Sequence, residues 1–265
     1  MRGDYIKPED AALTVRQWSE RWLDAYMVNR PSTVRQARTH IVRINDAMGD
    51  RRLSDVRPST VRSWIASMQD EGLKASTVYA LHSRLAQIMA DAVHDGLLHR
   101  SPCSRRTSPP MGKAKAYVAS SEQIWALHDV LEPENLRPAI LLGAFAGLRL
   151  GEVCGLRVQD VDFMRGSVTP KFQADGQPLK NDGSESTIPI PRQLALELSG
   201  YLERFPGEYV VNDGLGNPVK SFTIERAVRR ARVKINGLPE TFTHHDCRHH
   251  FASILIAGGA DIKTV

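Results

Sequence analysis

The sequence lacks long hydrophobic runs and paired cysteines. No apolar stretch among its 265 residues reaches the ~18 residues of a membrane span, so a transmembrane protein is not expected. The opening segment MRGDYIKPED has no apolar centre like that of a secretory leader, which favours a cytoplasmic location. Cys103, Cys154 and Cys247 are odd in number and widely spaced. They indicate reduced thiols, not a disulfide framework.

Positive charge is concentrated in one part of the chain. Residues 1–112 hold 17 Lys and Arg against 12 Asp and Glu, whereas residues 113–265 hold 18 against 18. The whole excess of +5 therefore lies in the N-terminal part, which is the part expected to contact a polyanion. An excess of this size also occurs in proteins that bind nothing acidic, so the charge alone does not identify a partner.

The N-terminal part, residues 1–98, is predicted to be helical. Apolar residues recur at helical intervals in four stretches, 13–27, 31–49, 57–72 and 74–96. The last three stretches end at glycines, which are common helix stops. Four helices of this length can enclose a small core.

The last three of these helices begin with Ser-Thr-Val next to basic residues. The hydroxyl groups could simply cap the first amides of each helix. A helix start with spare hydroxyls, amides and arginines can also bind phosphate. On that basis we place eight residues near DNA: Arg35, Arg38, Arg43, Lys74, Ser76, Thr77, Tyr79 and Arg84.

A basic Pro/Ser-rich linker, residues 99–117, separates the helical part from residues 118–265. The second part is predicted to be mixed α/β. Two short β-prone pieces, 167–172 and 186–190, lie between turn residues. The helices expected around them are 120–131, 135–148, 192–205, 219–235 and 243–259. The predicted fold is mainly α with a small β-sheet.

The stretch AFAGLRLGEV, 144–153, sets Arg149 among apolar residues. A guanidinium stays charged and rarely lies in such a setting without an anionic partner. Glu152, three positions later, could pair with it across one helical turn. On this stretch alone, the local ion pair is the simpler interpretation.

A second unusual stretch, HHDCRHHFAS, places four histidines around Arg248. His245 and His249 are four residues apart, like the two histidines of zinc peptidases. That pattern has a glutamate after the first histidine, whereas Asp246 follows here, and Arg248 would repel a dication. A zinc hydrolase therefore remains only an alternative interpretation.

The segments AGLRLGE and HDCRH, about a hundred residues apart, together resemble the two arginine boxes of the tyrosine recombinase (phage integrase) family. The family carries a lysine on a β-hairpin between these boxes. KNDGSESTIP, 180–189, matches that stretch at Lys180, Ser184, Ile188 and Pro189 but has Asn181 and Ser186 where Thr and Arg are usual. The resemblance extends over nearly the whole chain from about Leu13.

The resemblance implies a helical SAM-like core-binding domain followed by a mixed α/β tyrosine-recombinase catalytic domain. Arg149 and Arg248 would hold the two non-bridging oxygens of a scissile DNA phosphate. Lys180 would protonate the departing 5′ oxygen, and His245 would contact the phosphate or accept the nucleophile's proton. Glu152 would orient this cluster without touching the phosphate, and His249 would have an auxiliary role. No metal or other cofactor is implied.

The family's nucleophilic tyrosine has no counterpart in the sequence. Its six tyrosines, Tyr5, Tyr26, Tyr79, Tyr117, Tyr201 and Tyr209, all precede His245. We expect a C-terminal truncation, although an omitted segment or a tyrosine donated by a partner subunit are alternatives. These residues should then bind double-stranded DNA as a monomer in solution, in a bacterial host cell, without recombining it. The full-length protein would form a tetramer on DNA. A DNA-binding regulator without chemistry is the competing hypothesis.

Overall fold

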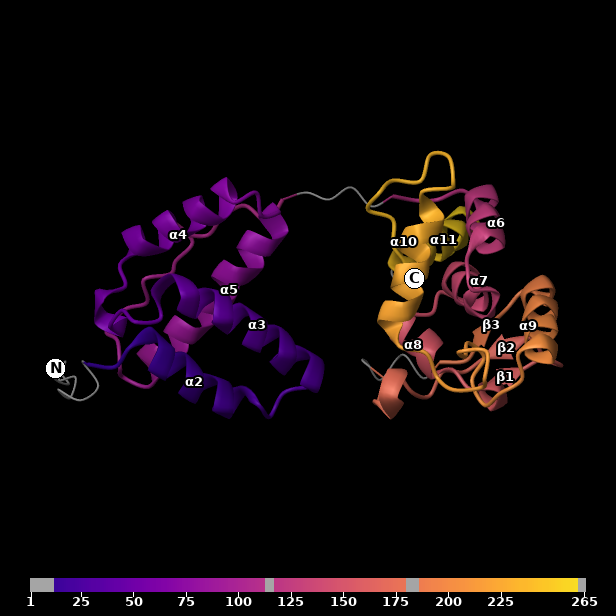
Figure 1. Cartoon of the computed structure of the whole chain (residues 1–265), viewed down its shortest axis with the longest axis horizontal. Coiled ribbons are helices and arrows are strands. Elements are labelled where there is room, and N and C mark those ends of the chain that lie inside the picture. Colours follow the sequence, from indigo (N-terminus) through magenta and orange to yellow (C-terminus); the bar gives the residue numbers. More distant parts are fainter. Residues whose placement is uncertain (1–11, 113–116, 180–185, 262–265) are drawn as a thin grey trace. The chain divides into compact units, whose positions relative to one another are not determined.

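A computed structural model describes residues 12–112, 117–179 and 186–261 of the chain. The chain divides into two compact units, Met1–Ala114 and Lys115–Val265, each with its own core (Figure 1). No helix in the described part of the chain is both long and apolar enough to cross a membrane.

The N-terminal unit contains the four predicted helices, each within a few residues of its expected bounds. They are α2 (Val15–Tyr26), α3 (Pro31–Met48), α4 (Pro58–Asp70) and α5 (Ala75–His94), with a 3₁₀ turn η1 (Leu53–Asp55) between α3 and α4. Thr14 caps α2 by accepting a hydrogen bond from the Gln17 amide. In contrast, the N-cap positions of α3, α4 and α5 are basic residues whose side chains make no capping hydrogen bond. The Ser-Thr pairs therefore lie inside the first turn and not at the N-cap position, although the Thr60 hydroxyl accepts a hydrogen bond from the Arg57 amide at 3.3 Å.

The core of the N-terminal unit is aliphatic, with tryptophans at its edge. Trp18 is buried and its indole Nε1 donates to the Ile88 carbonyl oxygen at 2.9 Å, which ties α2 to α5. Part of the segment expected as a linker also packs on this unit. The Thr107 hydroxyl and the His82 Nε2, both buried, lie 3.1 Å apart.

The C-terminal unit has six helices and a small sheet in its described residues. The helices are α6 (Ser121–Val130), α7 (Pro138–Phe145), α8 (Leu150–Gly155), α9 (Arg192–Arg204), α10 (Ser221–Arg232) and α11 (His244–Ala257). Short 3₁₀ turns lie at η2 (Glu134–Leu136), η3 (Val158–Asp160) and η4 (Ala174–Gly176). Helix α7 is buried along its length and packs extensively against α11 (Figure 1). This contact places the HDCRH box beside the AGLRLGE box.

The sheet is antiparallel, in the order β1-β2-β3, and consists of β1 (Val161–Asp162), β2 (Ser167–Val168) and β3 (Ile188–Pro189). Val168 pairs with Val161 on one side and with Ile188 on the other. Both strands expected from the sequence are present but short. Pro170 has no amide hydrogen to donate, which ends the pairing of β2 early. The predicted fold class, mainly α with a small sheet, is confirmed.

Candidate active site

Arg149 and Glu152 form an ion pair with two hydrogen bonds at the start of α8. Arg149 is the N-cap residue, with extended backbone angles. Its amide donates to Glu152 Oε2 and its Nη1 to Oε1, both at 2.8 Å. The Glu152 side chain is only 4% exposed, whereas that of Arg149 is 36% exposed. The ion pair expected from the sequence is confirmed, and about a third of the Arg149 side chain stays exposed.

Gly147 connects this pair to α11. It has a left-handed backbone (φ 65°), a region that side chains disfavour. Its carbonyl oxygen accepts a hydrogen bond from Nη1 of Arg248 on α11. The turn before Arg149 thereby fixes the second arginine of the site.

The two arginines are close enough to repel each other. Burial and the charge of Arg149 lower the pKa of Arg248, and Glu152 opposes this shift. Burial, His249 and both arginines lower the pKa of His245, although Asp246 acts in the opposite direction. Two guanidiniums and an imidazole therefore lie close together, and the buried carboxylate of Glu152 lies beside the two guanidiniums. Such a cluster carries excess positive charge and is suited to an anion.

The four histidines of α11 separate into two pairs. His244 and His250 are buried and contact backbone carbonyl oxygens, of Ala139 at 2.8 Å and of Ala119 at 2.9 Å respectively. His245 and His249 point away from the core, with ring centroids 4.7 Å apart. The inner pair anchors α11 to α7 and to the segment before α6, so only the outer pair is available at the site.

The zinc interpretation finds no support in this geometry. Asp246 is the third residue of α11, and its carboxylate accepts hydrogen bonds from the amide and hydroxyl of Thr243, both at 2.8 Å. It therefore caps the helix. Within residues 12–112, 117–179 and 186–261, no three His, Cys, Asp or Glu side chains are grouped to hold a metal ion.

Lys180 and Ser184 lie outside the described residues, so their predicted roles stay predictions. A Cβ added to Gly155 of α8 would lie 2.5 Å from the carbonyl oxygen of Phe172, which shows how closely the backbone before η4 approaches α8. Leu179, next to Lys180, is buried.

The residues placed near DNA in the N-terminal unit differ in their surroundings. Arg35 and Arg38 are exposed on α3 and line a shallow groove. Lys74, Ser76 and Thr77 are exposed at the start of α5, and Tyr79 is half-buried there. These positions are compatible with a phosphate contact, which remains a prediction.

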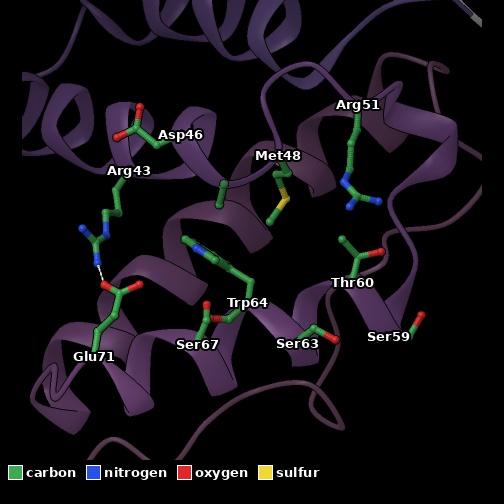
Figure 2. A pocket seen from close by; sticks show the side chains of 11 residues that line it. Arg43, Asp46, Met48, Arg51, Ser59, Thr60, Ser63, Trp64, Ser67 and Glu71 are labelled. Atoms are coloured by element: carbon green, nitrogen blue, oxygen red, sulfur yellow. Dashed lines mark hydrogen bonds and ion pairs between the residues drawn. The ribbon is translucent and has the colours of Figure 1, made fainter.

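Arg43 is already engaged within the unit. It reaches across a polar groove of about 580 Å³ between α3 and α4 and pairs with Glu71 (Figure 2). Arg51 lies at the other end of that groove, near Thr60. Arg43 would have to leave Glu71 to bind a phosphate, so it is the weakest of the predicted contacts.

Helix α10 carries a basic face that the sequence reasoning missed. Its buried residues include Ile224, Ala227, Val228 and Ala231. The opposite face exposes Phe222, Arg226, Arg229, Arg230 and Lys234, the last just beyond the helix end. The net charge of residues 113–265 gave no sign of this basic face, because acidic residues elsewhere in that part of the chain balance its positive charge. The 3.6-residue spacing could have revealed it.

The profile described as the phage integrase family matches residues 119–265, more than half of the chain. The chain belongs to the phage integrase family. This family of tyrosine recombinases carries out site-specific recombination.

Two bacterial recombinases illustrate the relationship. The tyrosine recombinase XerC of Rhodospirillum centenum is 24% identical over 97% of this chain and 78% of its own length. The XerC-like recombinase of Caldanaerobacter subterraneus subsp. tengcongensis is 24% identical over 83% of this chain and 66% of its own length. The chain thus spans about two thirds to four fifths of these relatives.

Solved integrases share the fold. A lambda integrase dimer bound to a COC′ core site aligns with a TM-score of 0.78 and 20% identity, over 96% of this chain and 75% of that one. The Tn1549 transposon integrase in complex with transposon right end DNA aligns with a TM-score of 0.81 and 18% identity, over 95% and 89%.

Proposed function

We propose that this integrase-family chain derives from a phage or mobile-element recombinase that cuts and rejoins double-stranded DNA through a 3′-phosphotyrosine intermediate. The observation that carries the proposal is the convergence of Arg149 and Arg248 near the buried carboxylate of Glu152. We assign core-type DNA binding to residues 1–98, a linking role to 99–117 and catalysis to 118–265. The protein would act in the bacterial cytoplasm, where its DNA is found.

In this proposal, a tyrosine hydroxyl attacks the phosphorus, the tyrosine O–P bond forms and the P–O5′ bond breaks. Negative charge builds on the two non-bridging oxygens, which Arg149 and Arg248 would hold by paired hydrogen bonds. His245, exposed and with a lowered pKa, would be neutral at pH 7 and able to accept the hydroxyl proton. Lys180 would protonate the leaving 5′ oxygen.

Glu152 would orient Arg149 through its two hydrogen bonds, and His249 would support His245 through their ring contact. The phosphotyrosine bond conserves the energy needed for rejoining, so no cofactor is part of the proposal. A tyrosine following His245 is missing from the 265 residues. We therefore propose that a polypeptide of these residues is a monomer that binds DNA without cleaving it, and that the full-length protein forms a tetramer on DNA.

A DNA-binding regulator derived from a recombinase is the second candidate, because the exposed arginines of α10 could bind DNA without any cleavage chemistry. An Arg149→Ala substitution in a chain extended through the family's tyrosine separates the two. Loss of strand cleavage would support the recombinase. Loss of DNA affinity in a chain that never cleaves DNA would support the regulator.

The exposed face of α10 provides a direct test of DNA binding. Replacing Arg226, Arg229 and Arg230 together by Gln removes three positive charges and leaves the buried face of α10 unchanged. If each arginine contacts one phosphate, the slope of log affinity against log salt should fall by about 1 per residue, roughly 3 in all. Fluorescence anisotropy on a 30-bp duplex at several salt concentrations would measure it.

The matched control is Arg165→Gln. Arg165 is 86% exposed in its side chain and lies in the turn between β1 and β2, beside Asp162. Its loss should change neither the slope nor the affinity. An unchanged slope in the α10 variant would count against α10 as a DNA contact, and no binding by the unmodified chain would remove the DNA proposal itself.

A further inference from the structure

Arg84 of α5 lies on an aromatic platform in the N-terminal unit. The rings of Trp22 and Tyr26, both on α2, are stacked with centroids 4.3 Å apart. The guanidinium carbon of Arg84 lies 5.6 Å from the Trp22 centroid and 5.0 Å from that of Tyr26. Trp22 is itself fixed, because its indole nitrogen donates to Asp91 at 2.6 Å. The guanidinium therefore lies beside two stacked rings, one of which is held in place by a hydrogen bond.

Arg84 is not neutralised by a carboxylate in the described part of the chain. Its Nη1 donates to the neutral side-chain oxygen of Gln87 at 2.7 Å, and its Nε is buried without a hydrogen-bond acceptor. Arg43, in contrast, pairs with Glu71 (Figure 2). A half-buried arginine without an acidic partner is costly unless an anion binds it.

His40 of α3 is the second polar group at this position. Its Nδ1 is buried without a hydrogen-bond partner. Burial lowers the pKa of His40, and the nearby charge of Arg84 lowers it further. The platform residues of α2, Trp22 and Tyr26, add no charge. Two nitrogen-bearing side chains from different helices thus lie close enough for the charge of Arg84 to act on His40, and each has a buried nitrogen without a hydrogen-bond partner.

We propose that Arg84 and His40 form a phosphate-binding site, with Trp22 and Tyr26 as the residues that position Arg84. The guanidinium would donate two parallel hydrogen bonds to phosphate oxygens, and the imidazole a third. Stacking on two rings limits the motion of the arginine before binding and so reduces the entropy lost on binding. The assignment of this phosphate to DNA rests on the proposed function. The existence of a phosphate-binding site at Arg84 and His40 does not depend on it.

The test is NMR of the ¹⁵N-labelled 265-residue chain, following the Arg84 Nε–H and His40 imidazole signals. Sodium phosphate is titrated at constant ionic strength against sodium chloride, and a 20-bp duplex is titrated separately. We expect saturable shifts of both side chains, with phosphate binding on the order of millimolar. A bound dianion should also raise the pKa of His40, because its charge favours the imidazolium.

Variants separate a binding role from a structural one. Arg84→Gln should weaken duplex binding roughly tenfold, since it loses a charged hydrogen-bonding group. Arg84→Lys keeps the charge but not the planar fork, so it should recover only part of the affinity. Arg16→Gln is the matched control in the same unit and should change duplex binding by less than about twofold, because Arg16 pairs with Asp50 and is not among the predicted DNA contacts. Urea unfolding of each variant verifies the fold.

Shifts with both phosphate and duplex would support a site for the DNA backbone. Shifts with phosphate alone would support a site for a small phosphorylated molecule. If phosphate shifts Arg84 but no duplex binds anywhere on the chain, the phosphate site stands and the proposed function fails. If the duplex binds while Arg84 and His40 respond to neither ligand, the proposed function stands and this site is overturned. An equal loss of affinity in Arg16→Gln would also overturn it.

Discussion

Replacing Gly147 by alanine is expected to destabilise the C-terminal unit by roughly 3 kcal/mol. One part of the cost is the left-handed backbone, which a side chain disfavours by about 1 kcal/mol. The other part is steric, because an added Cβ would collide with the ring of Phe251 on α11. Hydrogen exchange of the α7 and α11 amides at increasing urea concentration would measure the loss.

The two contributions can be separated with a double-mutant cycle. In a Phe251→Ala background the ring is gone, so Gly147→Ala should cost only about 1 kcal/mol more than that background. A Gly147→Ala cost that is the same in both backgrounds would show that the ring contact is not responsible. The carbonyl oxygen of Gly147 accepts a hydrogen bond from Arg248. A shift of this backbone in the Gly147→Ala variant should therefore also weaken DNA binding.

Lowering the pH from 7 to 5 is expected to reduce the stability of the same unit by about 2 kcal/mol through His244 alone. Burial lowers the pKa of this imidazole to about 4, from the ordinary value of 6.5. The unfolded chain therefore binds a proton that the folded chain does not over the range between these two values. The stability contributed by neutral His244 is complete above pH 6.5 and disappears as the pH falls toward 4.

The His244→Gln variant isolates this contribution. The glutamine amide can still donate to the Ala139 carbonyl oxygen but does not titrate. Urea unfolding, followed by hydrogen exchange in α7 and α11, should show about 2 kcal/mol less pH dependence in the variant between pH 7 and 5. Equal pH dependence in both proteins would mean that folding does not lower the pKa of His244.

The helical elements could be predicted from the sequence because their apolar residues repeat at 3.6-residue intervals. All four helices of residues 13–96 appear where that spacing placed them. Helix α8 was not predicted, since it is only six residues long and contains Gly151 and Gly155. The structure explains Gly155 by the close approach of the Phe172 backbone, a contact that no local pattern encodes.

The candidate site was partly predictable. The Arg149–Glu152 pair follows from spacing, and its meeting with Arg248 followed from the family resemblance. The separation of the histidines into an inner and an outer pair could not be predicted, because four imidazoles in seven residues look alike in sequence. Which ones face the core depends on how α11 packs against α7. The platform under Arg84 likewise depends on how α2 packs against α5.

The most direct test of the account uses a nicked duplex with a candidate core site, from which the cleaved end diffuses away so that a covalent intermediate accumulates. The 265-residue chain is incubated with it and run on native and denaturing gels, beside an Arg149→Ala/Arg248→Ala variant. We predict a native shift, weakened in the variant, and no adduct that survives denaturation. An adduct that survives would show that one of the six tyrosines before His245 attacks the DNA, and a shift unchanged by loss of both arginines would show that they do not hold the phosphate.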